Sequence, residues 1–247
     1  MRLVNHLKKQ IVILFIVGSI FLSPKILSEV IIIPPTENSQ ERLQEALILA
    51  NPGDIIQLTT GIYNLEDSLS LDVDEVTIQG DGHEKTILNF SDQKSGAQGL
   101  MVTSDKVILK NFAVLDTKGD AIKVKGSDGI SFIKVRTEWS GGPKSSNGAY
   151  GLYPVESKNV LIDGCIAIGA SDAGIYVGQS ENIVVRNSIA KFNVAFGLSK
   201  AERSYLTAGV KAAPNQPRPP GEAKLMLLVP SYGLCPIGIS VWGSPHT

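Results

Sequence analysis

Tyrosine, lysine and aspartate side chains recur at matching places in a repeated part of the chain. The repeats share the serines Ser127, Ser157 and Ser180, and the residues four positions before these serines are Lys123, Tyr153 and Tyr176. Three residues earlier again stand Asp120, Tyr150 and Ala173, and Asp172 precedes the last of them. A tyrosine combines an aromatic face with a hydrogen-bonding tip, and a row of such side chains suits the binding of a sugar chain.

The same residue types can also carry out acid–base chemistry. A carboxylate, a tyrosine and a lysine can move the proton at C5 of a uronic acid, if a cation or an arginine neutralises the sugar carboxylate. The predicted catalytic residues are Asp172, Tyr176 and Asp120, and the predicted substrate-binding residues are Lys123, Tyr150, Tyr153, Glu138 and Trp139. Glu138 and Trp139 are included because they end the strand before the longest loop, residues 140–148, which we expect to overhang this face.

Each candidate also has a structural explanation, and both explanations remain open. Tyrosines are common on exposed strand faces, because aromatic rings favour pleated surfaces. Asp120 and Asp172 stand next to glycine or alanine in predicted turns, where an aspartate often bonds its own backbone. Trp139 can serve as an anchor for the loop that follows it.

The sequence contains no recognisable metal-binding pattern. Of the three histidines, His83 falls in a predicted turn, and His6 and His246 lie near the two ends of the chain. These positions do not match the spacing of histidine ligands in zinc or copper sites. Neither the clustered carboxylates of a calcium-dependent pectate lyase nor the paired carboxylates of a glycosidase are evident. The sequence therefore predicts no metal site and assigns no cofactor.

The repeat that carries these residues predicts the fold. Four segments share an alternation of aliphatic and polar residues: Asp105-Lys-Val-Ile-Leu-Lys-Asn111, Asp128-Gly-Ile-Ser-Phe-Ile-Lys134, Lys158-Asn-Val-Leu-Ile-Asp-Gly164 and Glu181-Asn-Ile-Val-Val-Arg-Asn187. Each segment contains one pair of apolar residues of the same parity, which point to one side of a strand: Val107/Leu109, Ile130/Phe132, Val160/Ile162 and Ile183/Val185. On a later strand the inward positions are Ile122, Leu152, Ile175 and Leu198. Units of roughly two dozen residues bury such faces only by stacking, with each strand paired in parallel to its counterparts. The expected fold is an all-β parallel β-helix solenoid of about six rungs.

The segment before the solenoid predicts a cap. Residues 30–53 contain a short strand, Val30–Ile33, and then a helix from Ser39 to Ala50 whose apolar residues recur at helical spacing. Ser39 is the expected N-cap of this helix. A capping helix would cover the open apolar end of the β-helix, which we expect to span residues 54–203.

The two ends of the chain differ from the rest. Residues 1–29 predict a signal peptide, since basic residues precede the apolar run Ile11–Leu22, which is too short for a membrane span. An uncleaved anchor is the rival interpretation. Residues 204–247 hold one acidic residue and seven of the 13 prolines, without strand alternation. This Pro-rich tail indicates either a frame slip near Phe196 or a natural, disordered linker with a small C-terminal segment.

The composition limits the classes of function. The 247 residues are 43% hydrophobic and 19% charged, with a formal net charge of −1, which fits one elongated domain. A near-neutral charge balance argues against nucleic-acid binding, which usually needs a basic surface. Two cysteines are too few for a disulfide framework. Cys165 takes the place of Phe112 and Val135 in neighbouring repeats, and we expect it to be buried in the core.

A family resemblance agrees with this fold. The order of a helix, Asn51-Pro-Gly-Asp54, Gly61-Ile-Tyr63 and Val76-Thr-Ile-Gln-Gly-Asp-Gly82 resembles the start of bacterial right-handed parallel β-helix proteins of the pectate-lyase-like superfamily. The resemblance covers residues 30–195 and implies an exported member of a subgroup without a settled activity. The superfamily includes pectate lyases, alginate epimerases, polysaccharide hydrolases, phage tailspikes and a maturation protein of nitrous oxide reductase. Fold alone does not choose among these activities.

The function predicted from the sequence is the binding of an extended polysaccharide or cell-envelope glycan along an outer groove. The alternative is a polysaccharide lyase or uronate C5-epimerase acting on acidic polysaccharide through the same residues. Both versions place the protein outside the cytoplasm, secreted or periplasmic, without a stable membrane span after signal cleavage.

Overall fold

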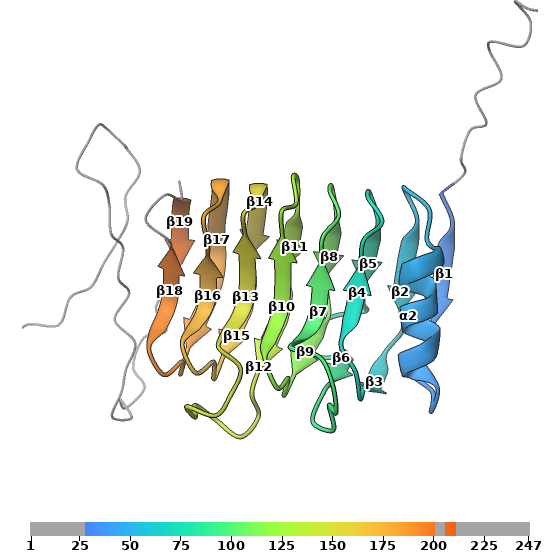
Figure 1. The fold of residues 1–247 in the computed structure, drawn as a ribbon, viewed down its shortest axis with the longest axis horizontal. Helices are drawn as coiled ribbons and strands as arrows, with labels where there is room; N and C mark the ends of the chain where they lie inside the picture. The colour runs from blue at the N-terminus through green and yellow to red at the C-terminus, as the bar shows by residue number, and fades with distance from the viewer. Residues whose placement is uncertain (1–27, 201–205, 211–247) are drawn as a thin grey trace, which may run out of the picture.

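The computed structural model describes residues 28–200 and 206–210. They form three parallel β-sheets that run along the molecule, with a helix at the N-terminal end (Figure 1). The predicted signal peptide, residues 1–29, lies outside the described residues except for Ser28 and Glu29. None of the helical structure described here has the length and apolar character needed to cross a membrane.

Each turn of the chain contributes one strand to each sheet. Sheet A contains β1 (Val30–Ile33), β2 (Ile55–Leu58), β5 (Thr77–Gln79), β8 (Ile108–Lys110), β11 (Ser131–Ile133), β14 (Lys158–Asp163), the start of β17 (Glu181–Lys191) and β19 (Leu206–Val210). Sheet B contains β3 (Gly61–Asn64), β6 (Thr86–Asn89), β9 (Ala113–Leu115), β12 (Arg136–Glu138), β15 (Ile166–Ile168) and the end of β17. Sheet C contains β4 (Leu69–Leu71), β7 (Gln98–Val102), β10 (Asp120–Lys125), β13 (Tyr150–Val155), β16 (Ala173–Val177) and β18 (Phe196–Lys200). The parallel β-helix predicted from the repeat is confirmed.

The core consists of columns of apolar side chains, one from each rung. In sheet A, Phe132 lies in register between Leu109 and Ile162, and all three are fully buried. In sheet C, Ile122 is in register with Leu152, which is in register with Ile175, as the repeat predicted. Full burial of such a side chain is worth about 1.5–3 kcal/mol, so the columns hold the rungs together. Cys165 is also fully buried, and its predicted core position is confirmed.

The corners between the sheets use left-handed backbone conformations at matching positions. One residue at the entry to sheet A has a positive φ in successive rungs: Gly53, Glu75, Lys106, Gly129, Asn159 and Asn182. It precedes the inward apolar residue in every one of these rungs but the first, where the buried Asp54 follows Gly53. Asparagine and glycine tolerate this conformation best, which explains the Asn and Gly signals of the repeat. Along this corner, Asn182 Nδ2 donates a hydrogen bond to Asn159 Oδ1 at 3.1 Å.

The helix α2 (Ser39–Leu49) closes the N-terminal end of the core. It buries Leu43, Ala46 and Leu47 and packs mainly against β4, the first strand of sheet C (Figure 1). The predicted capping helix is therefore present. The prediction that Ser39 is its N-cap is wrong: Asn38 holds that position, and Ser39 is the first helical residue. The Ser39 hydroxyl donates to the Thr36 carbonyl at 2.6 Å instead, because it is buried against the preceding turn.

The solenoid continues past the predicted boundary at residue 203. Strand β18 pairs with β16, and β19 pairs with β17 in sheet A, both in parallel. Leu206–Val210 thus form a strand within the segment that we expected to be tail. The remainder of the predicted Pro-rich tail lies outside the described residues.

Candidate functional site

The register of sheet C brings the predicted side chains to its outer surface. Lys123 pairs with Tyr153, and Tyr150 pairs with Ala173, as counted from the repeat. Because Ile122, Leu152 and Ile175 fill the core, the residue after each of them points outward. Tyr153 and Tyr176 are accordingly half-buried on the outer face, while their neighbours are fully buried.

Three of these side chains form what we call the tyrosine cluster: Tyr150, Tyr153 and Tyr176. The rings of Tyr150 and Tyr176 stack with centroids 4.5 Å apart and an interplanar angle of 22°. The Tyr153 ring lies 4.7 Å from Tyr150 and 5.2 Å from Tyr176, tilted against both. Contacts of this kind add about 0.5–1.5 kcal/mol per pair to burial alone, so the rings form one aromatic surface across β13 and β16.

Two carboxylates and one lysine border the tyrosine cluster. The Tyr150 hydroxyl donates to Asp172 Oδ2 at 3.2 Å, and the Tyr150 backbone N–H donates to Asp120 Oδ1 at 3.2 Å. Lys123 Nζ lies 4.9 Å from the centroid of the Tyr153 ring, in a cation–π arrangement. Asp172, Asp120 and Lys123, predicted from widely separated repeats, therefore meet around the same three rings.

The surroundings favour the neutral forms of several of these groups. Burial, with the neighbouring Asp172 carboxylate adding to it, raises the pKa of the Tyr150 phenol. Burial also raises the pKa of Tyr153, and Tyr176 and Asp120 add to the effect. Burial raises the pKa of the Asp120 carboxyl too, although the Lys123 cation opposes the shift. Tyr150 and Tyr153 thus remain protonated hydrogen-bond donors at neutral pH.

Two predicted residues lie elsewhere. Trp139 is only 4% exposed, and its Nε1–H donates to the Thr117 carbonyl at 2.8 Å, so it anchors the loop from inside. Glu138 belongs to sheet B, where its carboxylate pairs with Arg136 Nη1 at 3.1 Å. The loop 140–148 hangs from the lower side of the solenoid in Figure 1. The partners of Glu138 and Trp139 are thus Arg136 and Thr117, which lie outside the tyrosine cluster.

One aromatic residue that extends the site was missed. Phe196 of β18 pairs with Ala173, which continues the column that begins with Asp120 and Tyr150. Its side chain is half-buried. The sequence contains a signal for this position. Leu198 is the inward residue of its rung, as Leu152 is of an earlier one, and Phe196 precedes Leu198 by two residues, as Tyr150 precedes Leu152.

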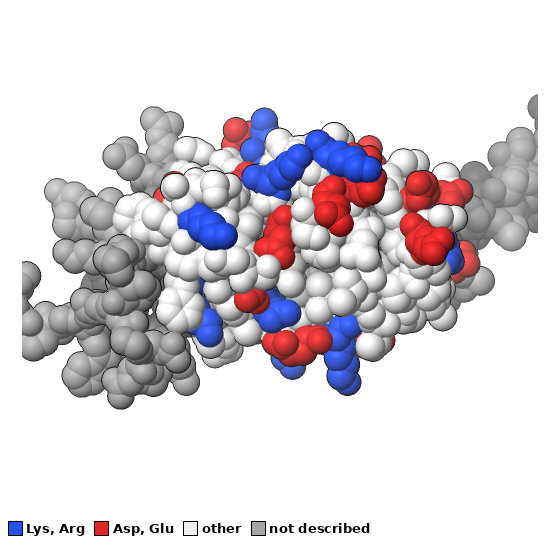
Figure 2. Space-filling view, turned by 90° about the horizontal axis from the view of Figure 1, so that it is seen from below, with Lys and Arg blue, Asp and Glu red and all other residues white. Residues whose placement is uncertain are grey.

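The charges outside the cluster are mixed. On the face seen in Figure 2, lysine and arginine side chains alternate with aspartate and glutamate, without a broad patch of one sign. In the part of the chain that the structure describes, no three His, Cys, Asp or Glu side chains gather into a metal-binding group.

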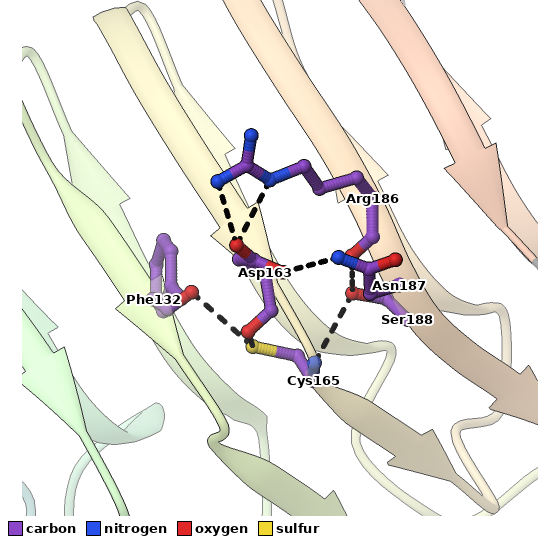
Figure 3. A network of polar contacts seen from close by, with 6 residues as sticks. All are labelled: Phe132, Asp163, Cys165, Arg186, Asn187 and Ser188. Carbon is purple, nitrogen blue, oxygen red and sulfur yellow. Dashed lines mark hydrogen bonds and ion pairs between the residues drawn. The ribbon is translucent and has the colours of Figure 1, made fainter.

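A polar network on sheet A shows how side chains join neighbouring rungs without forming a site. Arg186 Nε and Nη2 reach Asp163 Oδ2 at 2.9 and 2.8 Å, and Asn187 Nδ2 donates to Asp163 Oδ1 at 2.9 Å (Figure 3). Beneath them, the Cys165 backbone N–H donates to Ser188 Oγ at 3.1 Å. Burial raises the pKa of the Cys165 thiol to about 12, so the thiol is protonated and inert. Both Asp163 carboxylate oxygens are paired in this network, which fits a structural role.

Several solved structures are similar to this chain. The catalytic domain of an alpha-1,3-glucanase in complex with tetrasaccharides is 13% identical, with a TM-score of 0.51 over 69% of this chain and 31% of the glucanase chain. An alginate lyase is 14% identical, with a TM-score of 0.49 over 72% of this chain and 27% of the lyase. A pectin methylesterase in complex with a hexasaccharide is 10% identical, with a TM-score of 0.43 over 75% of this chain and 65% of the esterase. At these identities the likeness concerns the fold alone, and the chain spans about a third of the glucanase.

The sequence itself gives the family. No curated protein sequence matches the chain. Residues 75–210, more than half of the chain, match the model of the right-handed β-helix region. The matched residues begin at the second rung and end on the last residue of β19, so the family match and the stacked strands cover the same part of the molecule. The chain belongs to the right-handed β-helix family.

Proposed function

We propose that this protein binds an extended polysaccharide along the outer face of sheet C. The observation that carries the proposal is the tyrosine cluster, in which Tyr150, Tyr153 and Tyr176 from adjacent rungs form one aromatic surface with polar edges. Sugar rings present apolar C–H faces and a rim of hydroxyl groups. Tyrosine rings match the faces, and the Tyr hydroxyls with Asp120 and Asp172 match the rim.

The direction of the bound chain follows from the stacking. Parallel strands are spaced about 4.8 Å apart, so equivalent side chains recur at that interval along the solenoid axis. Tyr153 and Tyr176 stand one rung apart, and Phe196 of the next rung continues the neighbouring column. A ligand that runs along the axis crosses the strands and meets one of these side chains at each rung, whereas a ligand parallel to the strands meets a single rung.

Binding without turnover fits the cluster better than uronate chemistry. A lyase or C5-epimerase needs a base to remove the C5 proton and a cation to neutralise the sugar carboxylate. The raised pKa values of Tyr150 and Tyr153 oppose formation of a phenolate. The Lys123 cation already faces the Tyr153 ring, with Nζ 4.9 Å from the ring centroid. The lyase or epimerase is the alternative function, with Asp172, Tyr176 and Asp120 as its catalytic residues.

Native gels cast with single polysaccharides test both functions. The panel contains soluble glucans and mannans beside alginate, pectate and glycosaminoglycans. We expect at least one polysaccharide to retard the wild-type protein, and Tyr153→Ala combined with Tyr176→Ala to weaken retention about tenfold, at about 0.5–1.5 kcal/mol per ring. Phe192→Ala is the matched control, because that half-buried ring contacts Lys191 instead of the tyrosines.

Three outcomes decide between the functions. Retention by no polysaccharide, or equal retention of wild type and the double variant, would show that the tyrosine cluster is not a binding surface. Unsaturated sugar products or a changed uronate ratio, lost in Tyr176→Phe, would establish the lyase or epimerase instead. Retention without turnover, weakened only in the tyrosine variant, supports binding.

The proposed place of action is outside the cytoplasm, secreted or periplasmic. The proposal rests on the signal-like segment at residues 1–29. Expression of the full chain in a bacterial host, followed by cell fractionation and N-terminal sequencing, tests it. Recovery of uncleaved protein from the cytoplasm alone would contradict export.

A further inference from the structure

We infer that the polysaccharide recognised by the tyrosine cluster is a neutral one, and that polyuronates are disfavoured ligands. This inference rests on the proposed function and adds the substrate class. It follows from the charges that surround the three rings and from the partners that those charges already have.

Negative charge borders the cluster on two sides. Asp172 Oδ2 accepts the Tyr150 hydroxyl at 3.2 Å, and Asp120 Oδ1 accepts the Tyr150 backbone N–H at 3.2 Å. Both carboxylates therefore lie within hydrogen-bonding distance of the residue whose ring stacks on Tyr176. A sugar held on these rings lies close to both. A uronate carboxylate at the same place would meet two like charges in a half-buried setting, where charge repulsion is poorly screened.

The cations of this surface are already engaged. The described strands β10, β13 and β16 carry two basic side chains, Lys123 and Lys125. Lys123 Nζ stands over the Tyr153 ring at 4.9 Å, and Lys125 Nζ lies 3.9 Å from Glu156 Oε2. Neither strand that carries the tyrosines supplies an arginine, the residue best suited to grip a carboxylate with two hydrogen bonds. A polyuronate would have to displace an existing partner of each lysine.

A neutral sugar fits the same groups without such a cost. Its hydroxyl groups can donate to Asp120 and Asp172, and hydrogen bonds to a charged acceptor are stronger than those between neutral groups. The Tyr153 and Tyr176 rings receive the apolar faces of successive sugars. The two carboxylates thus act in opposite ways on the two ligand classes, which makes them specificity-determining residues.

Isothermal titration of the full chain with linear oligosaccharides of equal length tests the inference. Neutral glucose or mannose oligomers are compared with galacturonate and mannuronate oligomers, each at low and at physiological salt. We expect the neutral oligomers to bind at least about tenfold more tightly, with little salt dependence. The polyuronates should gain affinity as salt screens the carboxylates. Equal or tighter binding of a polyuronate by the wild type would overturn the inference while leaving the proposed function intact.

The double variant Asp120→Asn with Asp172→Asn provides the second test. It keeps the shape of both side chains and removes both charges, so polyuronate affinity should rise about tenfold or more. Neutral affinity should fall, because the side-chain amides accept weaker hydrogen bonds than the carboxylates do. Glu37→Gln, an exposed carboxylate at the far N-terminal end, is the matched control and should change neither. An equal rise in the control would mean that overall charge, not the site, sets the preference. Binding of neither class would remove the proposed function and this inference together.

Discussion

The two halves of the solenoid place their aromatic side chains on opposite sides of the strands. Every aromatic side chain described between residues 28 and 139 is buried: Tyr63, Phe90, Phe112, Phe132 and Trp139. Those described between residues 140 and 198 are all partly exposed: Tyr150, Tyr153, Tyr176, Phe192 and Phe196. One fold, built from one repeat, therefore uses the same residue types as core packing in one half and as surface in the other.

The core under the tyrosines is closely packed. Under the tyrosines, β13 and β16 carry Gly151 and Gly174, which face small side chains such as Ala167. A Cβ atom at Gly151 would stand 2.5 Å from both the Gly174 carbonyl oxygen and Thr137 Oγ1. The backbone of the second half is therefore packed closely against its neighbours, and its large rings lie outside. From this comparison we expect truncation of an aromatic side chain to reduce stability in the first half and ligand binding in the second.

The largest expected effect comes from a buried ring of the first half. Phe132→Ala should lower the free energy of unfolding by about 3–5 kcal/mol, because it leaves a cavity between Leu109 and Ile162. Tyr176→Ala should lower it by less than about 1.5 kcal/mol, since that ring is half in solvent. Urea unfolding of both variants measures the difference. Equal losses would break the contrast between the halves.

The next effect tests the close packing under the tyrosines. Gly151→Ala should destabilise the protein by about 1–3 kcal/mol, because the new methyl group overpacks a fixed backbone. Gly141→Ala is the control: its Cβ would meet only the Lys144 ammonium end, which can move away. Thermal unfolding monitored by circular dichroism compares the two. A Gly151→Ala protein as stable as wild type would show that β13 and β16 can move apart.

A smaller effect separates buried from surface tyrosines. The Tyr63 hydroxyl donates to the Ile33 carbonyl at 2.6 Å and lies 3.0 Å from the Thr59 carbonyl. Tyr63→Phe leaves these acceptors without their donor, at a cost of about 1–3 kcal/mol. Tyr153→Phe should change stability by less than about 0.5 kcal/mol, because its hydroxyl lies at the surface. The midpoints of urea unfolding provide the measurement, and a reversed order would contradict it.

The smallest effect concerns acid stability in the second half. Hydrogen bonds from Asn187 and Arg186 lower the pKa of the Asp163 carboxyl. The carboxylate therefore stabilises the fold at any pH above its unfolded pKa of about 3.9, and this contribution is lost as pH falls through the lower folded pKa. Asp163→Asn should remove less than about 1 kcal/mol at neutral pH and almost nothing in strong acid. The free energy of unfolding of wild type and variant, measured at several pH values, tests this prediction. A difference that does not vary with pH would show that the charge of Asp163 is not its cause.

Most of the fold could be predicted because a solenoid converts spacing in the sequence into position in space. Once Ile122, Leu152 and Ile175 are assigned to one inward column, the outward column of Lys123, Tyr153 and Tyr176 follows. The ring-to-ring contacts could not be read in this way, because they depend on rotamers. The hydrogen bond between the Tyr150 hydroxyl and Asp172 Oδ2 is an example, because the spacing of the two residues in the sequence does not determine it.

The direction of a corner side chain could not be predicted from the repeat. Glu138 and Trp139 stand at the end of sheet B, and the repeat does not say toward which sheet a corner side chain turns. The position of Leu206–Val210 was missed for a different reason: prolines and scarce acidic residues dominate the surrounding composition, while a strand of five residues needs only its own backbone. In that segment local composition was a poorer guide than the pairing of the strands.

The strand β1 has a consequence for how copies of this protein behave in concentrated solution. Within the described residues, β1 is the outer strand of sheet A, and its Val30 and Ile32 side chains are more than half exposed. An apolar strand with a free edge is a template on which another chain can add. Pro34 and Pro35 follow at once, and neither can donate a backbone hydrogen bond. Pro34 and Pro35 therefore prevent an intermolecular sheet that starts at β1 from extending beyond Ile33.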